Sequence, residues 1–105
     1  MEKERRFILE MAVSAYRLES ASDVFEQISK KRTEDLKNST NMDYLTLLPI
    51  KCIDENIFIQ IVGTECPDVF FILKFEPNLN DRIAMLYRPY EVDKFIREMK
   101  VREIL

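Results

Sequence analysis

Apolar positions in the first third of the chain follow the spacing of helices. Between residues 2 and 18, Phe7, Met11 and Leu18 recur four and seven positions apart, which places them on one helix face. Leu9 and Val13 add apolar surface elsewhere on the same predicted helix. A helix that is apolar on more than one face is expected to have more than one neighbour.

Two organisations are open for residues 1–37. Ser20 and Asp23 resemble a capping box, so the helix is predicted to break there and restart, giving a helical hairpin that packs on its own sheet. The alternative is one continuous helix whose seven-residue repeat forms a coiled-coil seam. The candidate dimerisation residues of that seam are Phe7, Met11, Leu18 and Phe25.

From Tyr44 onward the apolar period shortens toward two, which is the period of strands. The pattern predicts strands over residues 44–53, 57–62 and 69–75, and the segment RIAMLY at 82–87 can supply a fourth. Short segments rich in Asp, Asn, Glu and Pro separate them. We therefore expect an antiparallel meander of three or four strands.

Pro89 is predicted to begin a last helix, in which Val92, Phe95 and Ile96 share one face. The fold class is accordingly α+β: an N-terminal helix or helical hairpin, the meander, and a C-terminal helix. The chain of 105 residues fits one domain. It is divided into an N-terminal helical segment, residues 1–37, and an α+β head, residues 44–105, which together form that domain.

The second and third predicted strands carry large apolar side chains on both sides. Each has one wholly apolar side, such as Ile59 with Ile61, and one side that mixes apolar and polar residues. We expect the wholly apolar sides to lie under the chain's own helices, and a terminal helix or a partner to cover the mixed face. The candidate partner-docking residues are Phe58, Phe70, Ile72 and Tyr87. Tyr87 could equally close the end of the core.

Composition disfavours several kinds of function. With 16 basic and 19 acidic residues, the net charge of −3 gives no general attraction to nucleic acid or anionic lipid. The chain has no histidine and one glycine, so it lacks the commonest general base and a glycine-rich phosphate loop. Cys52 and Cys66 cannot complete a zinc site alone. We expect no enzyme activity, no cofactor, no metal and no small-molecule substrate.

The start of the chain bears on its compartment. The segment MEKERR is charged and has no secretory signal, and no apolar run approaches the roughly 18 residues that a membrane span needs. An intracellular location, nuclear or cytoplasmic, is therefore expected, with both cysteines as free thiols.

Four segments give the chain a resemblance to a known family. They are YLTLLPIKCI, FFILKF, PNLND and YEVDKFIREMK, within residues 44–103. In this order they resemble the RWD-like head domains of kinetochore and chromosome-segregation coiled-coil proteins. The resemblance implies a non-catalytic scaffold that forms a homodimer or heterodimer with a like or related head and offers a docking surface to segments of other proteins.

A second binding function remains open from the sequence. Small acidic cytosolic chaperones and adaptors, such as secretion chaperones, share a helix-first α+β layout. A chain of this kind would hold an extended client along its sheet.

Overall fold

The computed structural model describes residues 2–38, 46–64, 66 and 68–104. Within these residues the chain forms three α-helices and a five-stranded antiparallel sheet, which confirms the predicted α+β class. The elements are α1 (Glu2–Tyr16), α2 (Ala21–Asn38), β1 (Thr46–Leu47), β2 (Lys51–Asp54), β3 (Ile57–Gly63), β4 (Phe70–Glu76), the 3-10 turn η1 (Pro77–Leu79), β5 (Asp81–Tyr87) and α3 (Pro89–Ile104).

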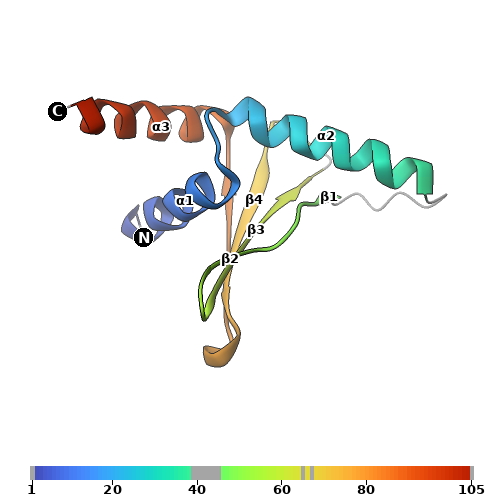
Figure 1. Ribbon diagram of the computed structural model, residues 1–105, viewed down its shortest axis with the longest axis horizontal. Helices are drawn as coiled ribbons and strands as arrows, with labels where there is room; N and C mark the ends of the chain where they lie inside the picture. The colour runs from blue at the N-terminus through green and yellow to red at the C-terminus, as the bar shows by residue number, and fades with distance from the viewer. Residues whose placement is uncertain (1, 39–45, 65, 67, 105) are drawn as a thin grey trace.

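The helices gather beside one face and the upper end of the sheet. Figure 1 shows the sheet nearly edge-on, with α1 beside it and with α2 and α3 across its upper end. The lower end, which includes η1, projects away from the helices. The molecule is accordingly elongated, with extents of 50 × 33 × 21 Å.

The first two helices form a hairpin and not one continuous helix. Arg17 has a left-handed φ of 52°, and the Leu18 amide donates to the Val13 carbonyl at 3.0 Å, which together form a Schellman motif at the end of α1. The Asp23 carboxylate accepts hydrogen bonds from the amides of Glu19 and Ser20 at 2.7 and 3.1 Å. The break predicted at Ser20 is confirmed, and the continuous heptad alternative is wrong.

The first strand is interrupted, unlike the continuous strand predicted over residues 44–53. Residues 44 and 45 lie outside the described residues, and Pro49 separates β1 from β2. Proline has no amide hydrogen, so it cannot donate to the ladder. Tyr16 of α1 bridges the gap, since its hydroxyl donates to the Pro49 carbonyl and accepts from the Ile61 amide at 3.2 Å.

The remaining predicted strands are confirmed as β3, β4 and β5. The strand order is β1-β3-β4-β5, and β2 also pairs with β3. The PNLND segment forms η1, which ends at Asn80 in the left-handed conformation with a φ of 53°. The predicted C-terminal helix begins at Pro89 as α3.

The register of β3 against β4 overturns our assignment of the sheet faces. Ile61 pairs with Ile72, and Gly63 pairs with Phe70. The wholly apolar side of β3 therefore shares a face with the mixed side of β4. That face contacts α1 and is fully buried at Ile59, Ile61, Phe70 and Ile72. The prediction failed because register decides which sides of two strands meet, and alternation within each strand does not contain it.

One hydrophobic core joins the helices to the sheet. Its buried members come from α1, α2, the sheet and α3, so the N-terminal helical segment and the α+β head share a single cluster. At Gly63, an added Cβ would lie 3.0 Å from the Ile28 side chain of α2. The lone glycine therefore permits the close approach of α2 to β3. Among the described residues, no helix is long and apolar enough to cross a membrane.

Candidate protein-interaction site

The four residues predicted for dimerisation do not form an exposed seam. Met11 and Leu18 are 6% and 5% exposed within the chain's own core. Phe25 is half-buried, and its ring packs edge-to-face on Phe70 with centroids 5.8 Å apart. Phe7 is 49% exposed. The predicted coiled-coil seam is wrong, because the chain itself covers its central side chains.

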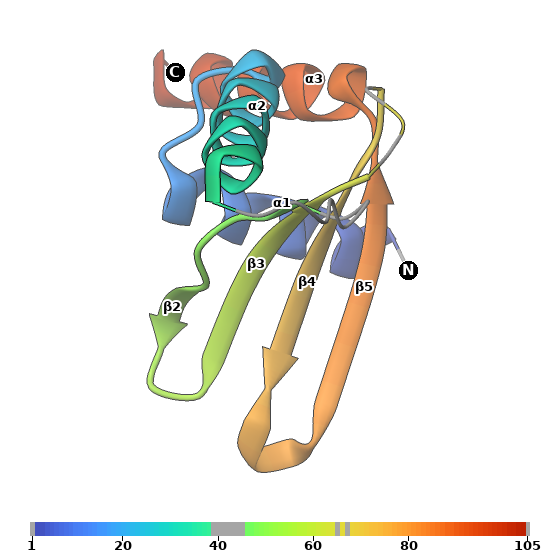
Figure 2. The same ribbon diagram turned by 90° about the vertical axis from the view of Figure 1, so that its right-hand side faces the viewer.

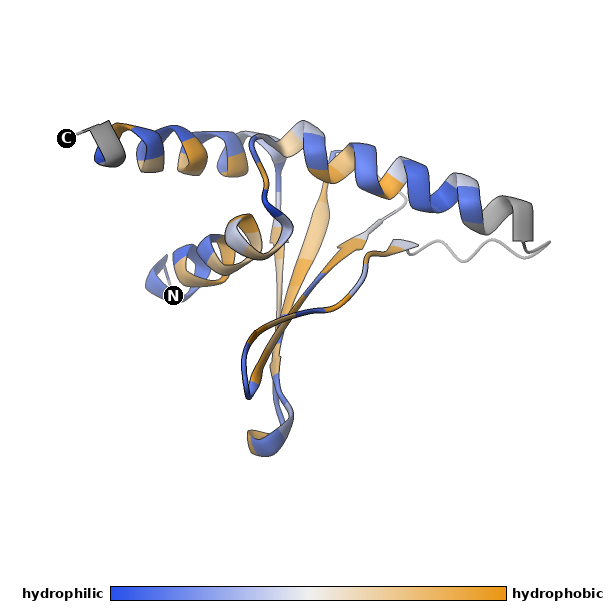
Figure 3. Cartoon of the chain, in the orientation of Figure 1, coloured by the Kyte–Doolittle hydropathy of each residue, from blue (hydrophilic) through white to orange (hydrophobic). Residues whose placement is uncertain are grey.

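Three of the four predicted docking residues also lie in the core. Phe70, Ile72 and Tyr87 are fully buried, so they offer no surface to a partner and this part of the docking prediction is wrong. Phe58 lies on the opposite face, half-buried and stacked on Phe75 with centroids 5.5 Å apart. Figure 3 shows that β3 and β4 are hydrophobic along most of their length, so both faces carry apolar side chains.

The face opposite α1 carries a second set of large apolar side chains. Strand pairing places them in rows across the sheet, such as Val62, Phe71 and Leu86. Figure 2 looks onto this face, with α1 passing behind the sheet and α2 and α3 above it. We call this surface the open face and define it as Leu47, Phe58, Gln60, Val62, Phe71, Leu73, Phe75, Arg82, Ala84 and Leu86.

The open face is accessible at its edges and hollowed near its lower half. Leu47 is 49% exposed and Leu86 is 36% exposed, whereas Phe71, Leu73 and Phe75 are half-buried and Val62 is buried. A shallow groove of about 290 Å³ is lined by Ile50, Gln60, Leu73, Lys74, Phe75 and Arg82.

The polar group in the centre of the open face is already satisfied. The Gln60 side-chain amide donates to the Leu48 carbonyl at 2.8 Å, so this residue does not need a ligand. Neighbouring, partly exposed apolar side chains with little unsatisfied polar chemistry are typical of a protein-binding surface.

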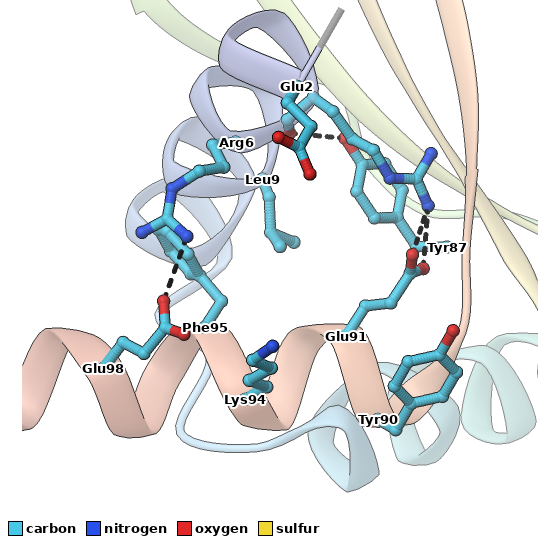
Figure 4. Close-up of a pocket in the computed structure, with 10 residues that line it drawn as sticks. Glu2, Arg6, Leu9, Tyr87, Tyr90, Glu91, Lys94, Phe95 and Glu98 are labelled. Atoms are coloured by element: carbon cyan, nitrogen blue, oxygen red, sulfur yellow. Dashed lines mark hydrogen bonds and ion pairs between the residues drawn. The ribbon is translucent and has the colours of Figure 1, made fainter.

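A charged cleft lies between α1, β5 and α3 (Figure 4). Arg5 donates to both carboxylate oxygens of Glu91 at 2.7 and 2.8 Å and to the Leu86 carbonyl at 2.6 Å. Its guanidinium lies over the Tyr87 ring, 4.4 Å from the centroid. The Tyr87 hydroxyl donates back to the Arg5 carbonyl at 2.7 Å. Burial raises the pKa of Tyr87 to about 12, against an opposing effect of Arg5.

The outer half of this cleft is also paired. Arg6 donates to Glu98 at 3.0 Å and lies over the Phe95 ring at 5.3 Å, and its hydrogen bond lowers the pKa of Glu98. Glu2 and Lys94 complete the charged lining of a space of about 250 Å³. Three acids face three bases, and both arginines are engaged by acids. The cleft therefore joins α1 to β5 and α3, and we assign it a structural role.

A third hollow lies under α2 and is closed by polar contacts. Its arginine, Arg32, donates to the Thr46 hydroxyl at 2.7 Å and to the Thr64 carbonyl. Cys66 at its rim and Cys52 on β2 are exposed free thiols. Across the described part of the chain, no group of three or more His, Cys, Asp or Glu side chains could hold a metal ion.

The sequence pattern did not predict most residues of the open face. Phe71, Leu73 and Phe75 were expected to lie under the helices, because their side of β4 is wholly apolar. The signal that could have corrected this lies in β5, where Ile83 and Met85 alternate with Arg82 and Ala84. Those two side chains pack against the core on the face of Ile72.

Comparisons with family models, with curated proteins and with solved structures return no match for this chain.

Proposed function

We propose that this chain is a non-catalytic protein-interaction domain that docks an amphipathic helix of another protein on its open face. The observation that carries the proposal is the set of large side chains on that face, above all Phe71, Leu73, Phe75 and Leu86, which the chain's own helices leave uncovered. Side chains of this size each contribute about 1.5–3 kcal/mol when they become fully buried.

The charge on the open face defines the chemistry of the partner. Arg82 is its charged residue and lines one side of the groove beside Leu73 and Phe75. An apolar helix stripe over Leu73 and Phe75, with an acidic residue near Arg82, would complement both features. Helix-in-groove recognition commonly uses such spaced apolar anchors.

We further propose the head of a kinetochore or chromosome-segregation coiled-coil protein as the particular class. The support is the resemblance over residues 44–103, together with an α+β order that begins and ends with helices. A nuclear or cytoplasmic location follows from this proposal. The class predicts partners drawn from the chromosome-segregation machinery.

Site-specific photo-crosslinking in cells tests the docking surface. A photo-reactive phenylalanine analogue replaces Ile50, which is 53% exposed at the rim of the groove. The expected result is a discrete adduct whose partner segment, mapped by mass spectrometry, is an amphipathic helix. The matched control carries the analogue at Lys30, an exposed position on α2, and should give no such adduct.

The mapped segment is then made as a peptide and titrated against the purified chain. Binding should weaken about tenfold or more with Leu73→Lys, because the lysine places a charge in the apolar groove. Equal binding of wild type and Leu73→Lys, or adducts from Lys30 alone, would refute docking on the open face.

A chaperone-like adaptor is the second candidate, favoured by the free edge of β5. That strand is last in the sheet order, so an extended client could add to it by backbone hydrogen bonding. The same crosslinking separates the two functions. With the photo-reactive analogue at Ala84, adducts to many unrelated extended segments would support the adaptor. With the analogue at Ile50, adducts to one helical partner would support the interaction domain.

A further inference from the structure

The edge of β5 presents a defined set of backbone groups to solvent. The Leu48 amide donates to the Ile61 carbonyl. The backbone N–H and C=O groups of odd-numbered β3 residues therefore point toward β1 and β2, and those of even-numbered residues point toward β4. Gln60 pairs with Leu73, so the backbone groups of Leu73 point toward β3. Ala84 pairs with Leu73, so its own backbone groups point away from β4. The same holds for the other even-numbered residues of β5. The outward N–H and C=O groups belong to Arg82, Ala84 and Leu86.

A hydrogen bond from α1 supports this assignment independently. The Leu86 carbonyl accepts from the Arg5 guanidinium at 2.6 Å. Arg5 therefore occupies a position at the outer edge where the amide of an added strand would also point.

The β5 edge is long and regular, although Arg82 and the Arg5 bond to the Leu86 carbonyl place charge on it. Its sequence, DRIAMLY, has no proline and no lysine, and it pairs with β4 in one continuous register from Asp81 to Tyr87. Natural proteins commonly protect edges of this length with lysine, proline or a bulge. The small side chain of Ala84 lies at the centre of the strand.

We propose that two copies of this chain pair through β5, antiparallel, with the two-fold axis at Ala84. In this register each Ala84 faces the partner's Ala84, and Arg82 faces the partner's Leu86. Every outward N–H of the strand then meets an outward C=O of the second copy. The two sheets become one, and their open faces join into a single wider surface. The inference goes beyond the proposed docking function and does not depend on what binds the open face.

Opposite charges approach each other in this register. It places Asp81 opposite the partner's Tyr87, on the face where the partner's Arg5 lies over that tyrosine ring. Each Asp81 carboxylate therefore comes beside the partner's Arg5, which also bonds to Glu91 of its own chain, once on each side of the axis. The Leu86 carbonyl has two lone pairs, so it can accept from Arg5 and from the partner's Arg82 amide together.

The test uses two charge variants at the axis. Light scattering and sedimentation of the full chain should show a concentration-dependent dimer. Ala84→Lys and Ala84→Glu should each weaken it roughly tenfold, because opposite residues in an antiparallel pair lie within about 5 Å and like charges there repel. An equimolar mixture of the two variants should dimerise again, since lysine then faces glutamate.

The variants should remain folded, because Ala84 is exposed and its backbone amide faces away from β4. Circular dichroism and a thermal melt check this. A second variant, Asp81→Asn, should weaken the dimer and reduce its salt dependence, whereas Asp68→Asn, an exposed change in the β3–β4 loop, should not.

Two results would overturn the pairing: a wild-type chain that is monomeric at every concentration, or a dimer that neither charge at position 84 weakens. Such a failure leaves the helix adduct at Ile50 unaffected. Conversely, loss of that adduct with an intact, charge-sensitive dimer would refute only the docking function.

Discussion

The two faces of the sheet are built from the same strands but differ in what covers them. Ile72 is fully buried against α1, whereas its neighbour Leu73 is half-buried on the open face. Both are large aliphatic residues of β4. The comparison teaches that apolar character alone does not identify the core of this protein, because the position of α1 decides which face is used for folding.

The covered face combines apolar burial with specific polar contacts. The hydroxyl of Tyr16 satisfies the Ile61 amide beside the break at Pro49, and Tyr87 bonds to the backbone of α1. On the open face, the Gln60 side chain bonds to Leu48 in the segment between β1 and β2. The helices are therefore fixed to one face, and the other keeps partly exposed apolar side chains among the described residues.

The largest expected difference between the faces is in stability. Ile72→Ala should lower the free energy of unfolding by about 2–5 kcal/mol, because it leaves a cavity in the core. Leu73→Ala should cost about 1 kcal/mol, since its side chain is already half-exposed. Urea denaturation of the two single variants measures both values. Equal losses would show that the open face is as important for folding as the covered one.

A smaller loss is expected where α1 bridges the interrupted strand. Tyr16→Phe keeps the ring in the core but removes the hydroxyl, so the Ile61 amide and the Pro49 carbonyl lose a partner. Leaving such groups unsatisfied costs about 1–3 kcal/mol.

The matched control for this change is Tyr90→Phe, at a tyrosine that is 66% exposed, and it should be neutral in the same denaturation experiment. An unchanged stability in Tyr16→Phe would mean that water replaces the bridge.

The smallest expected effect is a pH dependence. Burial raises the pKa of Tyr87 from 10.0 to about 12. Its contribution to stability is therefore complete below pH 10 and is lost as the pH rises toward 12. The loss should stay below about 1 kcal/mol at about pH 11, because solvent at the cleft screens the hydroxyl.

Chemical denaturation between pH 8 and about 12, compared with Tyr87→Phe, isolates this contribution. The variant should lose stability less steeply over the interval. Parallel curves would show that Tyr87 ionises in the folded chain near its ordinary pKa.

The elements of the fold could be predicted from the sequence because their signals are local. Ser20 with Asp23 marks the start of α2, Pro89 begins α3, and alternation identifies β3, β4 and β5. Capping, proline geometry and strand alternation each depend on a few neighbouring residues.

The candidate site could not be predicted in the same way. Whether Leu73 or Ile72 faces α1 depends on how β4 pairs with β3, and a shift of one residue exchanges every side chain between the faces. The contact that bridges the split at Pro49 comes from Tyr16, which lies far away in the sequence. Of the four residues predicted for docking, Phe58 lies on the open face, whereas Phe70, Ile72 and Tyr87 lie in the core.

The most direct test of the account compares partner capture and folding in one variant. The chain with the photo-reactive analogue at Ile50 is expressed with and without Leu73→Lys, and both adduct yield and thermal melting are measured. We predict that the adduct is lost while the chain remains folded, since Leu73 lies on the open face. An undiminished adduct in a folded Leu73→Lys chain would contradict the claim that the open face is the docking surface.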